Sequence, residues 1–498
     1  MKDKNLNDNF FSKEKFHSLL KTDPDFLSQL FTELVEQNTN LFKLTNEQQK
    51  TIEMLESKIK ELEAHLNKNS HNSSKPPSSD GLKKKTKSLR KKSGKMNGGQ
   101  KGHHGKTLKS NPKPDIIETI KLDICPNCSN DLSGTPVIGT ENRQVTDVKK
   151  SEVETIEYQA QIKECGNCNS IVTAKFPENV NSRIQYGENL KAYIVYFRNL
   201  NFIPTERAAE IFEDIFGVPL SEGTIYNTVN DIGSKLAPFE KWIKEKLLQS
   251  SILHFDETGI RIEKKLHWIH NISNEEYTFY APHKNRGEKA IKYIGILPAF
   301  NGNVVHDYWK SYLSFENCSH SLCNAHHLRE LTFLYEEEKL EWAGEMIKLL
   351  LEIKEKVDKS PMNKLEEKDS LVYENRYDMI VQKGSHETPP PEQNNVLKRG
   401  RKKKGKALCL LERFRDKKQM ILAFMHYEDI PFDNNQAERD IRMAKLYQKI
   451  SGCFRTFQGA ETFLLIRSYL STVKKQGMNI IDSIVKLFHT QDMLEIFG

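Results

Sequence analysis

The chain has 498 residues, of which 37% are hydrophobic and 29% charged, with a formal net charge of +7. A chain of that length is too long to fold around a single hydrophobic core, so we expect several domains. No apolar run approaches the roughly 20 residues that span a bilayer, and the first residues lack the apolar core of a secretory signal. We therefore expect no membrane partner and a cytoplasmic protein. The eight cysteines are few, and four form CxxC pairs, which favours metal binding over a disulfide framework.

Residues 45–68 carry apolar side chains at alternating spacings of three and four, which is the a/d seam of a coiled coil. The seam residues are Ile52, Leu55, Ile59, Leu62 and Leu66. A coiled coil this short is marginal alone but suffices for dimerisation when other contacts help. The alternative is a helix that packs on its own domain.

Positive charge is concentrated in two segments. Residues 81–114 hold twelve Lys or Arg and no acidic residue, and residues 398–406 hold seven positive charges. Such segments bind DNA phosphates through counterion release without reading sequence; the alternative is a solvated linker. The first lies in a stretch with almost no apolar residues, so we expect a disordered arm that could become ordered on DNA. The expected phosphate contacts are Lys83, Lys84, Lys85, Arg90, Lys91, Lys92, Arg399, Arg401, Lys402 and Lys403.

Two CxxC pairs follow the basic arm, with 36 residues between them. Each CxxC turn lets two thiolates grip one ion, and two such turns complete a tetrahedral zinc site. The predicted ligands are Cys125, Cys128, Cys165 and Cys168, and the ion would be structural. The β-rich residues 145–148 and 153–162 are expected to form hairpins between the pairs. The alternative is four reduced thiols in a core.

Residues 204–233 read as two helices around a turn at 216–220. Pro204 suits a first-turn position and Ser221 suits an N-cap. Apolar residues recur on one face of each helix: Ala208, Ile211 and Ile215, then Ile225, Val229 and Ile232. This pattern predicts a helix-turn-helix that binds DNA, although generic helix pairs look similar.

Beyond residue 251 the pattern becomes three short strands, a helix and another strand, which indicates a mixed α/β core. Asp256 and Asp307 each follow a hydrophobic strand, and a carboxylate held at a strand end suits a pair of metal ions. Glu257 is expected to start the turn after its strand. Taken singly, each aspartate is more often a turn residue.

The segment PFDNNQAERDIRM, residues 431–443, places Glu438 about one turn into a helix that Asn434 or Asn435 can cap. Such a helix beside the sheet would supply the third metal ligand, with Asp433 as the fallback. Two basic residues follow on the same side and could hold DNA phosphates: Arg442 and Lys445.

These motifs together resemble transposases of the insertion sequence 66 family, within the DDE transposase superfamily. The resemblance covers nearly the whole chain and is carried by NSSKPPSSDG, GGQKGHHG, the CxxC pairs, HFDETG, HDYWKSY, CNAHHLRE and, most distinctively, PFDNNQAERDIRM with GCFRTFQGAE. It implies a ribonuclease-H-like catalytic domain with Asp256, Asp307 and Glu438 as the metal-binding triad. It also implies a helical insertion between the second aspartate and the glutamate.

The resemblance also implies an activity. The protein would bind the terminal inverted repeats of an insertion sequence and catalyse DNA cleavage and strand transfer with two Mg²⁺ or Mn²⁺ ions, beside structural Zn²⁺. Its partners would be element-end and target DNA, further copies of itself as a dimer or higher oligomer, and accessory proteins of the element. It would sit on the bacterial nucleoid when bound. The rivals are a non-catalytic DNA-binding regulator and a nuclease that cuts without joining.

The segment CSHSLCNAHH, residues 318–327, holds further metal-ligand types. Cys323 and His326 match a C-x-x-H element that follows the second aspartate in related transposases, where it would support the active site or the insertion; Asn435 would give support at the start of the Glu438 helix. Cys318 and His320 could instead join them in a second zinc site, or all four could serve helix packing.

We thus expect a multidomain α+β protein. Its predicted parts are N-terminal helices and a short coiled coil (1–68), a disordered basic arm (69–115), a zinc ribbon (116–180), a helix-turn-helix region (181–245), the first part of the ribonuclease-H-like domain (246–324), a helical insertion with a basic loop (325–427), and the catalytic helix with C-terminal helices (428–498).

Overall fold

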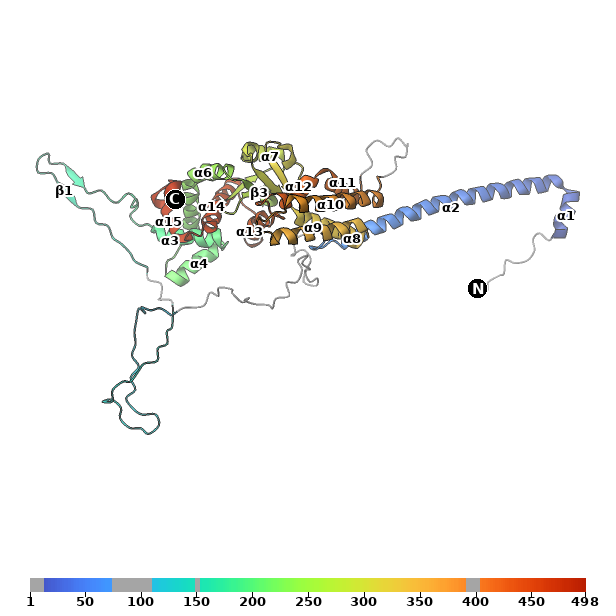
Figure 1. Cartoon of the computed structure of the whole chain (residues 1–498). Coiled ribbons are helices and arrows are strands. Elements are labelled where there is room, and N and C mark those ends of the chain that lie inside the picture. The colour runs from blue at the N-terminus through green and yellow to red at the C-terminus, as the bar shows by residue number, and fades with distance from the viewer. Residues whose placement is uncertain (1–12, 74–109, 148–152, 391–403) are drawn as a thin grey trace, which may run out of the picture. The chain divides into compact units, whose positions relative to one another are not determined.

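The computed structural model describes residues 13–73, 110–147, 153–390 and 404–498 (Figure 1). The basic residues of the arm and of the loop near 400 that were expected to contact DNA lie outside these ranges. The chain divides into two compact units. The first comprises Met1–Ser88 and Leu328–Gly344, and the second comprises Leu89–His327 and Glu345–Gly498. The expectation of an α+β protein with a helical N-terminal region is confirmed.

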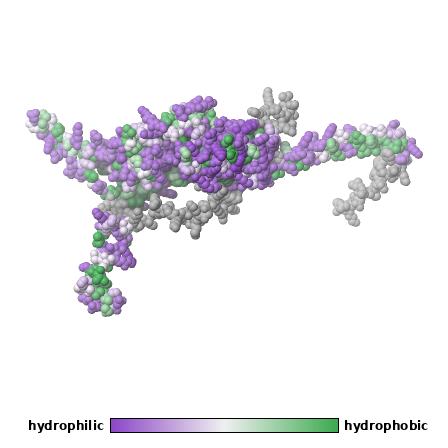
Figure 2. Space-filling view, viewed as in Figure 1, coloured by the Kyte–Doolittle hydropathy of each residue, from purple (hydrophilic) through white to green (hydrophobic). Residues whose placement is uncertain are grey.

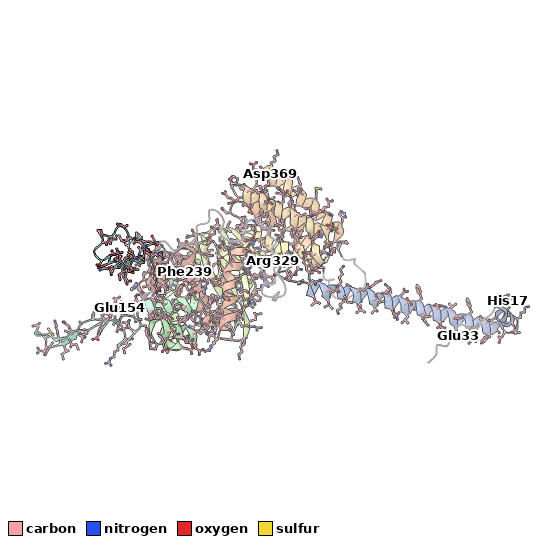
Figure 3. All side chains as sticks on the ribbon, turned by 90° about the horizontal axis from the view of Figure 1, so that it is seen from below. His17, Glu33, Glu154, Phe239, Arg329 and Asp369 are labelled. Atoms are coloured by element: carbon pink, nitrogen blue, oxygen red, sulfur yellow. The ribbon has the colours of Figure 1, made fainter. Side chains whose placement is uncertain are left out.

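The first unit contains a short helix, α1 (Lys13–Thr22), and a helix of 43 residues, α2 (Pro24–Leu66). Asp23 caps α2 because its side chain accepts a hydrogen bond from the Phe26 N–H at 3.1 Å. Side chains stand off α2 along its length, as at Glu33 (Figure 3), and hydrophobic residues recur among hydrophilic ones (Figure 2). Helix α2 begins at Pro24, well before residue 45, where the predicted coiled-coil segment starts.

The apolar seam of α2 keeps one heptad register through the whole helix. Its exposed hydrophobic positions are Phe31, Leu34, Leu41, Ile52, Leu55, Ile59, Leu62 and Leu66. Polar residues interrupt the seam at Asn38, Thr45 and Gln48. Since these large side chains are about half or more exposed in the single chain, the face is apolar and uncovered within the described residues.

The second unit begins with two thiol-bearing turns. The first contains Cys125 and Cys128, and the second lies between the antiparallel strands β1 (Ile162–Glu164) and β2 (Ile171–Thr173). Residues 145–147 and 153–161 carry no strand, so the expectation of hairpins between the turns is wrong for this described part.

Helices fill the next part of the second unit. They are α3 (Glu188–Val195), a π-helical turn (Tyr196–Leu200), α4 (Thr205–Phe216), α5 (Glu222–Lys235) and α6 (Ala237–Leu248). Gly217, at φ +64°, ends α4, and Ser221 caps α5 by accepting the Thr224 N–H at 3.1 Å, as predicted.

The predicted apolar faces of α4 and α5 need one revision. Phe212 rather than Ile215 completes the buried face of α4, and Ile215 is 51% exposed. Phe212 packs with Ala208 and with Ile225 of α5 in one hydrophobic cluster. The helix pair is therefore held together as expected, with one position misassigned.

A five-stranded mixed sheet forms the centre of the second unit, in the order β5-β4-β3-β6-β7. The strands are β3 (Ile252–Ile262), β4 (Lys265–Ser273), β5 (Thr278–His283), β6 (Asn303–His306) and β7 (Ser319–Leu322). The first three are antiparallel neighbours, while β6 is parallel to β3 and β7 is parallel to β6. Helix α7 (Glu288–Ile294) lies in the connection from β5 to β6.

The remaining helices follow β7. They are α8 (Asn324–Glu337), α9 (Glu341–Lys359), α10 (Glu367–Glu387), α11 (Lys406–Asp416), α12 (Lys418–His426), α13 (Asn435–Ser451), α14 (Phe457–Lys475), α15 (Ile480–His489) and α16 (Met493–Phe497). Helix α13 packs on β3 and β4, and α14 packs on β5. No helix in the described residues is both long and apolar enough to cross a membrane.

Candidate active site

The sheet register brings two aspartates to the same level. Strands β3 and β6 are parallel, and His254 pairs with Val305. Asp256 stands two residues beyond His254 within β3, and Asp307 stands two residues beyond Val305, just after β6 ends, so the two aspartates lie at the same level of neighbouring chain segments. Helix α13, which carries Glu438 in its first turn, packs on β3. The three predicted triad residues thus come from neighbouring elements of one unit.

Asp256 was expected at the end of a strand, but it lies within one. Strand β3 continues to Ile262 because it pairs with β4. Burial, followed by the neighbouring charges of Glu257, Asp307 and Glu438, raises the pKa of Asp256 to about 8. Asp307 Oδ1 accepts the Trp309 N–H at 3.0 Å. Like charges surround the partly buried carboxylate of Asp256 and repel its charged form. A bound cation would reduce that repulsion.

Glu257 was expected to start a turn, and that prediction is wrong. It lies in β3 with its side chain buried. Arg286 donates to Glu257 Oε1 from Nε at 2.8 Å, with Nη2 at 2.6 Å, and Tyr312 donates its hydroxyl to Oε2. Burial and then the charge of Asp307 raise the pKa of Glu257, while Tyr312 and Arg286 oppose that rise.

The guanidinium of Arg286 links this carboxylate to the loop that carries Asp307. It lies 3.8 Å from the ring centroid of Trp309 and 5.0 Å from that of Trp268. Trp309 is thereby held against Arg286, and its N–H is bonded to Asp307. Sequence reasoning missed this network, since nothing in the sequence pairs Arg286 with Glu257.

Glu438 lies beside a thiol and an imidazole. One ligand atom each from Cys323, His326 and Glu438 lie within 4.8 Å of one another, and in the described ranges this is the one such group of three. His326 Nδ1 is 3.8 Å from Glu438 Oε1, and Arg442 Nη2 is 3.6 Å from Oε2. Asp307 and Glu438 are therefore close enough to Asp256 to contribute to its raised pKa, but the three carboxylates are more widely spaced than this group.

Asn434 connects three elements around the site. Its Oδ1 accepts from His254 Nδ1 at 2.7 Å, its Nδ2 donates to the Phe255 carbonyl at 2.8 Å, and its N–H donates to Cys323 Sγ at 3.1 Å. The expected side-chain cap of α13 is absent at this residue. The amide instead ties the start of α13 to β3 and to the residue after β7, which fixes Glu438 relative to Asp256.

Other acidic and basic residues of the 431–443 region and just beyond take structural roles. Asp433 Oδ1 accepts the Asn435 N–H at 3.1 Å. Asp440 forms an ion pair with Lys475, with 2.8 Å between Oδ2 and Nζ. Lys445 donates to the Gly259 carbonyl, so in this structure its ammonium contacts the protein rather than standing free for phosphate.

The four side chains Cys318, His320, Cys323 and His326 do not form one group among the described residues. His320 Nδ1 shares a hydrogen bond with His306 Nε2 at 3.0 Å, and Cys318 Sγ lies 3.7 Å from His320 Nε2. Burial, then His320, lowers the pKa of His306 to about 3. Cys318 and His320 therefore pack beside His306 of β6, whereas Cys323 and His326 lie beside Glu438.

The two CxxC turns have the same backbone form. The Ser129 N–H donates to the Cys125 carbonyl at 2.8 Å, and the Asn169 N–H donates to the Cys165 carbonyl at 2.8 Å. Both donors adopt positive φ, at 60° and 54°. Backbone N–H groups lower the pKa of Cys125, as N–H···S bonds to a metal-binding thiolate would. All four thiols are free, and the pairs are not gathered into one group within the described residues.

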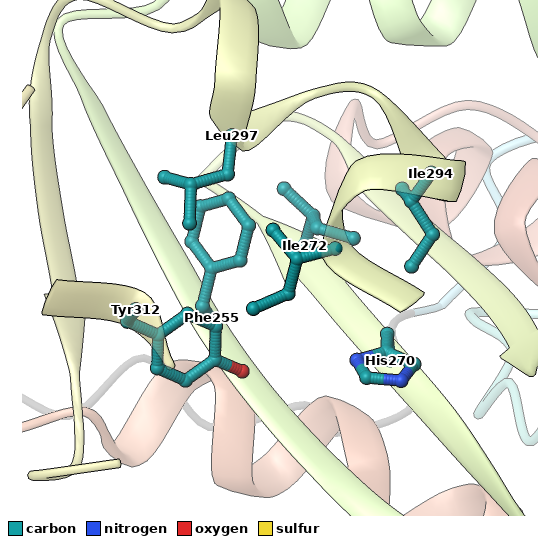
Figure 4. A pocket seen from close by; sticks show the side chains of 7 residues that line it. Phe255, His270, Ile272, Ile294, Leu297 and Tyr312 are labelled. Atoms are coloured by element: carbon teal, nitrogen blue, oxygen red, sulfur yellow. The ribbon is translucent and has the colours of Figure 1, made fainter. Parts of the chain in front are cut away.

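A small pocket lies on the sheet beside α7 (Figure 4). Its lining is mostly apolar and consists of Phe255, His270, Ile272, Ile291, Ile294, Leu297 and Tyr312. None of the triad carboxylates lines it, so it lies apart from them.

Carboxylates gathered on neighbouring strands and an adjacent helix are typical of enzymes that use divalent metal ions. The comparison with protein families makes this specific. The model of the transposase IS66 family matches residues 183–462, a range that includes all three triad positions. The chain belongs to this family, which confirms the resemblance seen in the sequence and implies an enzyme that cuts and joins DNA.

Two further comparisons add less. Residues 22–109 match a family of unknown function, DUF6444. A solved structure, the Drosophila P element transposase strand transfer complex, is 10% identical and aligns over 61% of this chain and 95% of its own, with a TM-score of 0.28. A TM-score this low does not define a shared fold. No curated protein matches the chain.

Proposed function

We propose that the protein is a DDE-type DNA transposase whose catalytic domain is ribonuclease-H-like. The strand order β5-β4-β3-β6-β7, with three antiparallel strands followed by two parallel ones, supports this assignment. Helices α8 to α12 lie in the chain between the second aspartate and the glutamate, where the insertion is expected. The proposed catalytic residues are Asp256, Asp307 and Glu438.

The observation that carries the proposal is the convergence of these carboxylates from β3, the end of β6 and the first turn of α13. Burial, and then the charges of Glu257, Asp307 and Glu438, raise the pKa of Asp256, and a bound divalent cation would offset both effects. Oxygen ligands from carboxylates suit Mg²⁺ or Mn²⁺. Two such ions, when bound, would supply the activation of water or a 3′-hydroxyl and the stabilisation of the leaving oxygen.

The chain's own residues position this chemistry. Asn434 fixes the Glu438 helix against β3, and the Glu257–Arg286 pair holds the loop that bears Asp307. Arg442, which is exposed and near Glu438, would contact a DNA phosphate. Strand transfer replaces one phosphodiester by another, so no nucleotide cofactor is required.

DNA recognition would fall to the remaining modules. The α4–α5 pair is proposed as a helix-turn-helix and the two CxxC turns as a structural zinc ribbon that together bind the terminal inverted repeats. The basic segments around 81–114 and 398–406 would hold phosphates. The exposed seam of α2 is proposed to pair two copies, so that two element ends are joined together.

Joining of element-end DNA to a target plasmid by the purified chain tests the proposal. We expect Mg²⁺-dependent cleavage and joining by the wild type, and loss of both with retained DNA binding in Asp256→Asn and Glu438→Gln. Glu276→Gln, an exposed carboxylate between β4 and β5, is the matched control and should stay active. Joining by the triad variants would refute the triad. Wild-type binding without cleavage would favour a regulator, and cleaved ends that never join would favour a nuclease.

A further inference from the structure

The structure contains a second set of metal-ligand atoms that the carboxylate chemistry does not use. Cys323 follows β7, His326 lies in the first turn of α8, and Glu438 lies in the first turn of α13. We propose that Cys323, His326 and Glu438 bind one Zn²⁺ ion, distinct from any ion in the CxxC turns. Through Glu438 this ion would orient a triad carboxylate, so this consequence rests on the function proposed above.

The spacing of the ligand atoms fits one ion with little rearrangement. Two ligands about 2.0–2.3 Å from a tetrahedral ion stand roughly 3.3–3.8 Å apart. His326 Nδ1 and Glu438 Oε1 are 3.8 Å apart, and all three ligand atoms lie within 4.8 Å of one another. Small side-chain rotations would bring all three into the coordination range.

The surroundings of each atom favour ligation over simple packing. His326 Nδ1 is buried and has no hydrogen-bond partner among the described residues, and 3.8 Å to Glu438 is too long for a hydrogen bond. Cys323 is buried, and its Sγ accepts the Asn434 N–H at 3.1 Å, as metal-bound thiolates accept backbone N–H groups. A nitrogen left without a partner at this place is explained by an ion.

The donor set selects the metal. A thiolate and an imidazole are soft or borderline ligands, which favour Zn²⁺ and disfavour Mg²⁺. The neighbouring group of Asp256 and Asp307 offers only oxygen, which favours Mg²⁺. The two adjoining sites have ligands of different softness, so the Cys323 site would hold Zn²⁺ and the carboxylate site Mg²⁺.

Glu438 would be shared between them. Its Oε1 faces His326, while Oε2 lies toward Arg442 at 3.6 Å. Binding of Oε1 to zinc would restrict the rotation of the carboxylate and leave Oε2 available to the catalytic ions. Asn434 supports the same arrangement, because it bonds both Cys323 and β3. Zinc would thus act as a positioning element for the third triad residue.

The zinc content of the purified full-length protein tests this site. We expect Cys323→Ser and His326→Asn each to lose about one equivalent of zinc relative to the wild type. His326→Cys, which keeps a zinc ligand, should retain that equivalent. Cys318→Ser is the matched control, because Cys318 lies five residues away and contacts His320 instead, and it should lose none. His326 is partly exposed, so its variants test the site even if Cys323→Ser fails to fold.

The outcomes separate the two proposals. Wild-type zinc content in both Cys323→Ser and His326→Asn would overturn the zinc site and leave the triad untouched. Loss of zinc in those variants together with full joining activity in Glu438→Gln would support the zinc site and refute the proposed function. Loss of zinc with a slower joining rate and unchanged DNA affinity supports both.

Discussion

Replacement of Asp256 by asparagine should stabilise the metal-free protein, although it destroys the proposed chemistry. Asp256 is partly buried beside Glu257, Asp307 and Glu438, and these surroundings raise its pKa from 3.8 to about 8. The folded chain therefore holds a proton that the unfolded chain releases. Asparagine keeps the size and polarity of the side chain and removes the charge.

The sign and the magnitude follow from proton linkage. Because the folded-state pKa is the higher one, the stabilising contribution is complete below about pH 4 and is lost as the pH rises toward 8. At pH 7 the loss is at most about 4 kcal/mol. Water entry and side-chain movement relieve part of it, so we expect Asp256→Asn to gain roughly 1–3 kcal/mol at pH 7. The gain should vanish near pH 4.

Thermal unfolding in a chelator, at pH 4.5 and at pH 7.5, measures this effect. The variant should melt several degrees above the wild type at pH 7.5 and nearly with it at pH 4.5. Added Mg²⁺ should raise the melting temperature of the wild type and leave Asp256→Asn unchanged. Glu276→Gln should behave as the wild type throughout. A variant that melts below the wild type at pH 7.5 would refute the electrostatic reasoning.

Three further predictions concern the supporting parts. Glu257→Ala removes the partner of Arg286, so the joining rate should fall roughly tenfold or more while DNA affinity is kept; kinetics at saturating DNA measure this, and an unchanged rate would contradict the positioning role. Asn38→Leu fills a polar seam position of α2, so the coiled coil should melt higher and form larger oligomers. Sedimentation measures this, and an unaltered dimer of unaltered stability would argue against the seam. Cys165→Ser should cost about one zinc equivalent and weaken end-DNA binding without affecting the triad; full zinc content by elemental analysis would exclude the ribbon.

Local patterns predicted much of the fold. The helix signals around Ser221 and the strands around Asp256 carry capping residues and apolar runs that act over a few positions, and the structure has both elements. The order of three strands, a helix and a strand was also predicted. Strand β7, Ser319–Leu322, was missed because it has four residues and reads as a Cys- and His-rich loop.

Long-range contacts could not be predicted. That β3 continues past Asp256 depends on its ladder with β4, and burial of Glu257 depends on Arg286, which is 29 positions away. Asn434 was predicted as a cap because of its place before a helix, yet its amide bonds β3. These side chains choose partners that only the assembled sheet provides, and sequence spacing carries no signal of them.

The central claim is that Asp256, Asp307 and Glu438 act together on DNA through bound divalent metal. Single-turnover joining of pre-cleaved end DNA, with Mg²⁺ titrated against wild type and Glu438→Gln, tests it most directly. We expect joining by the wild type that saturates with Mg²⁺, and no joining by the variant at any Mg²⁺ concentration, with equal DNA binding. Joining by Glu438→Gln at the wild-type rate would contradict the account.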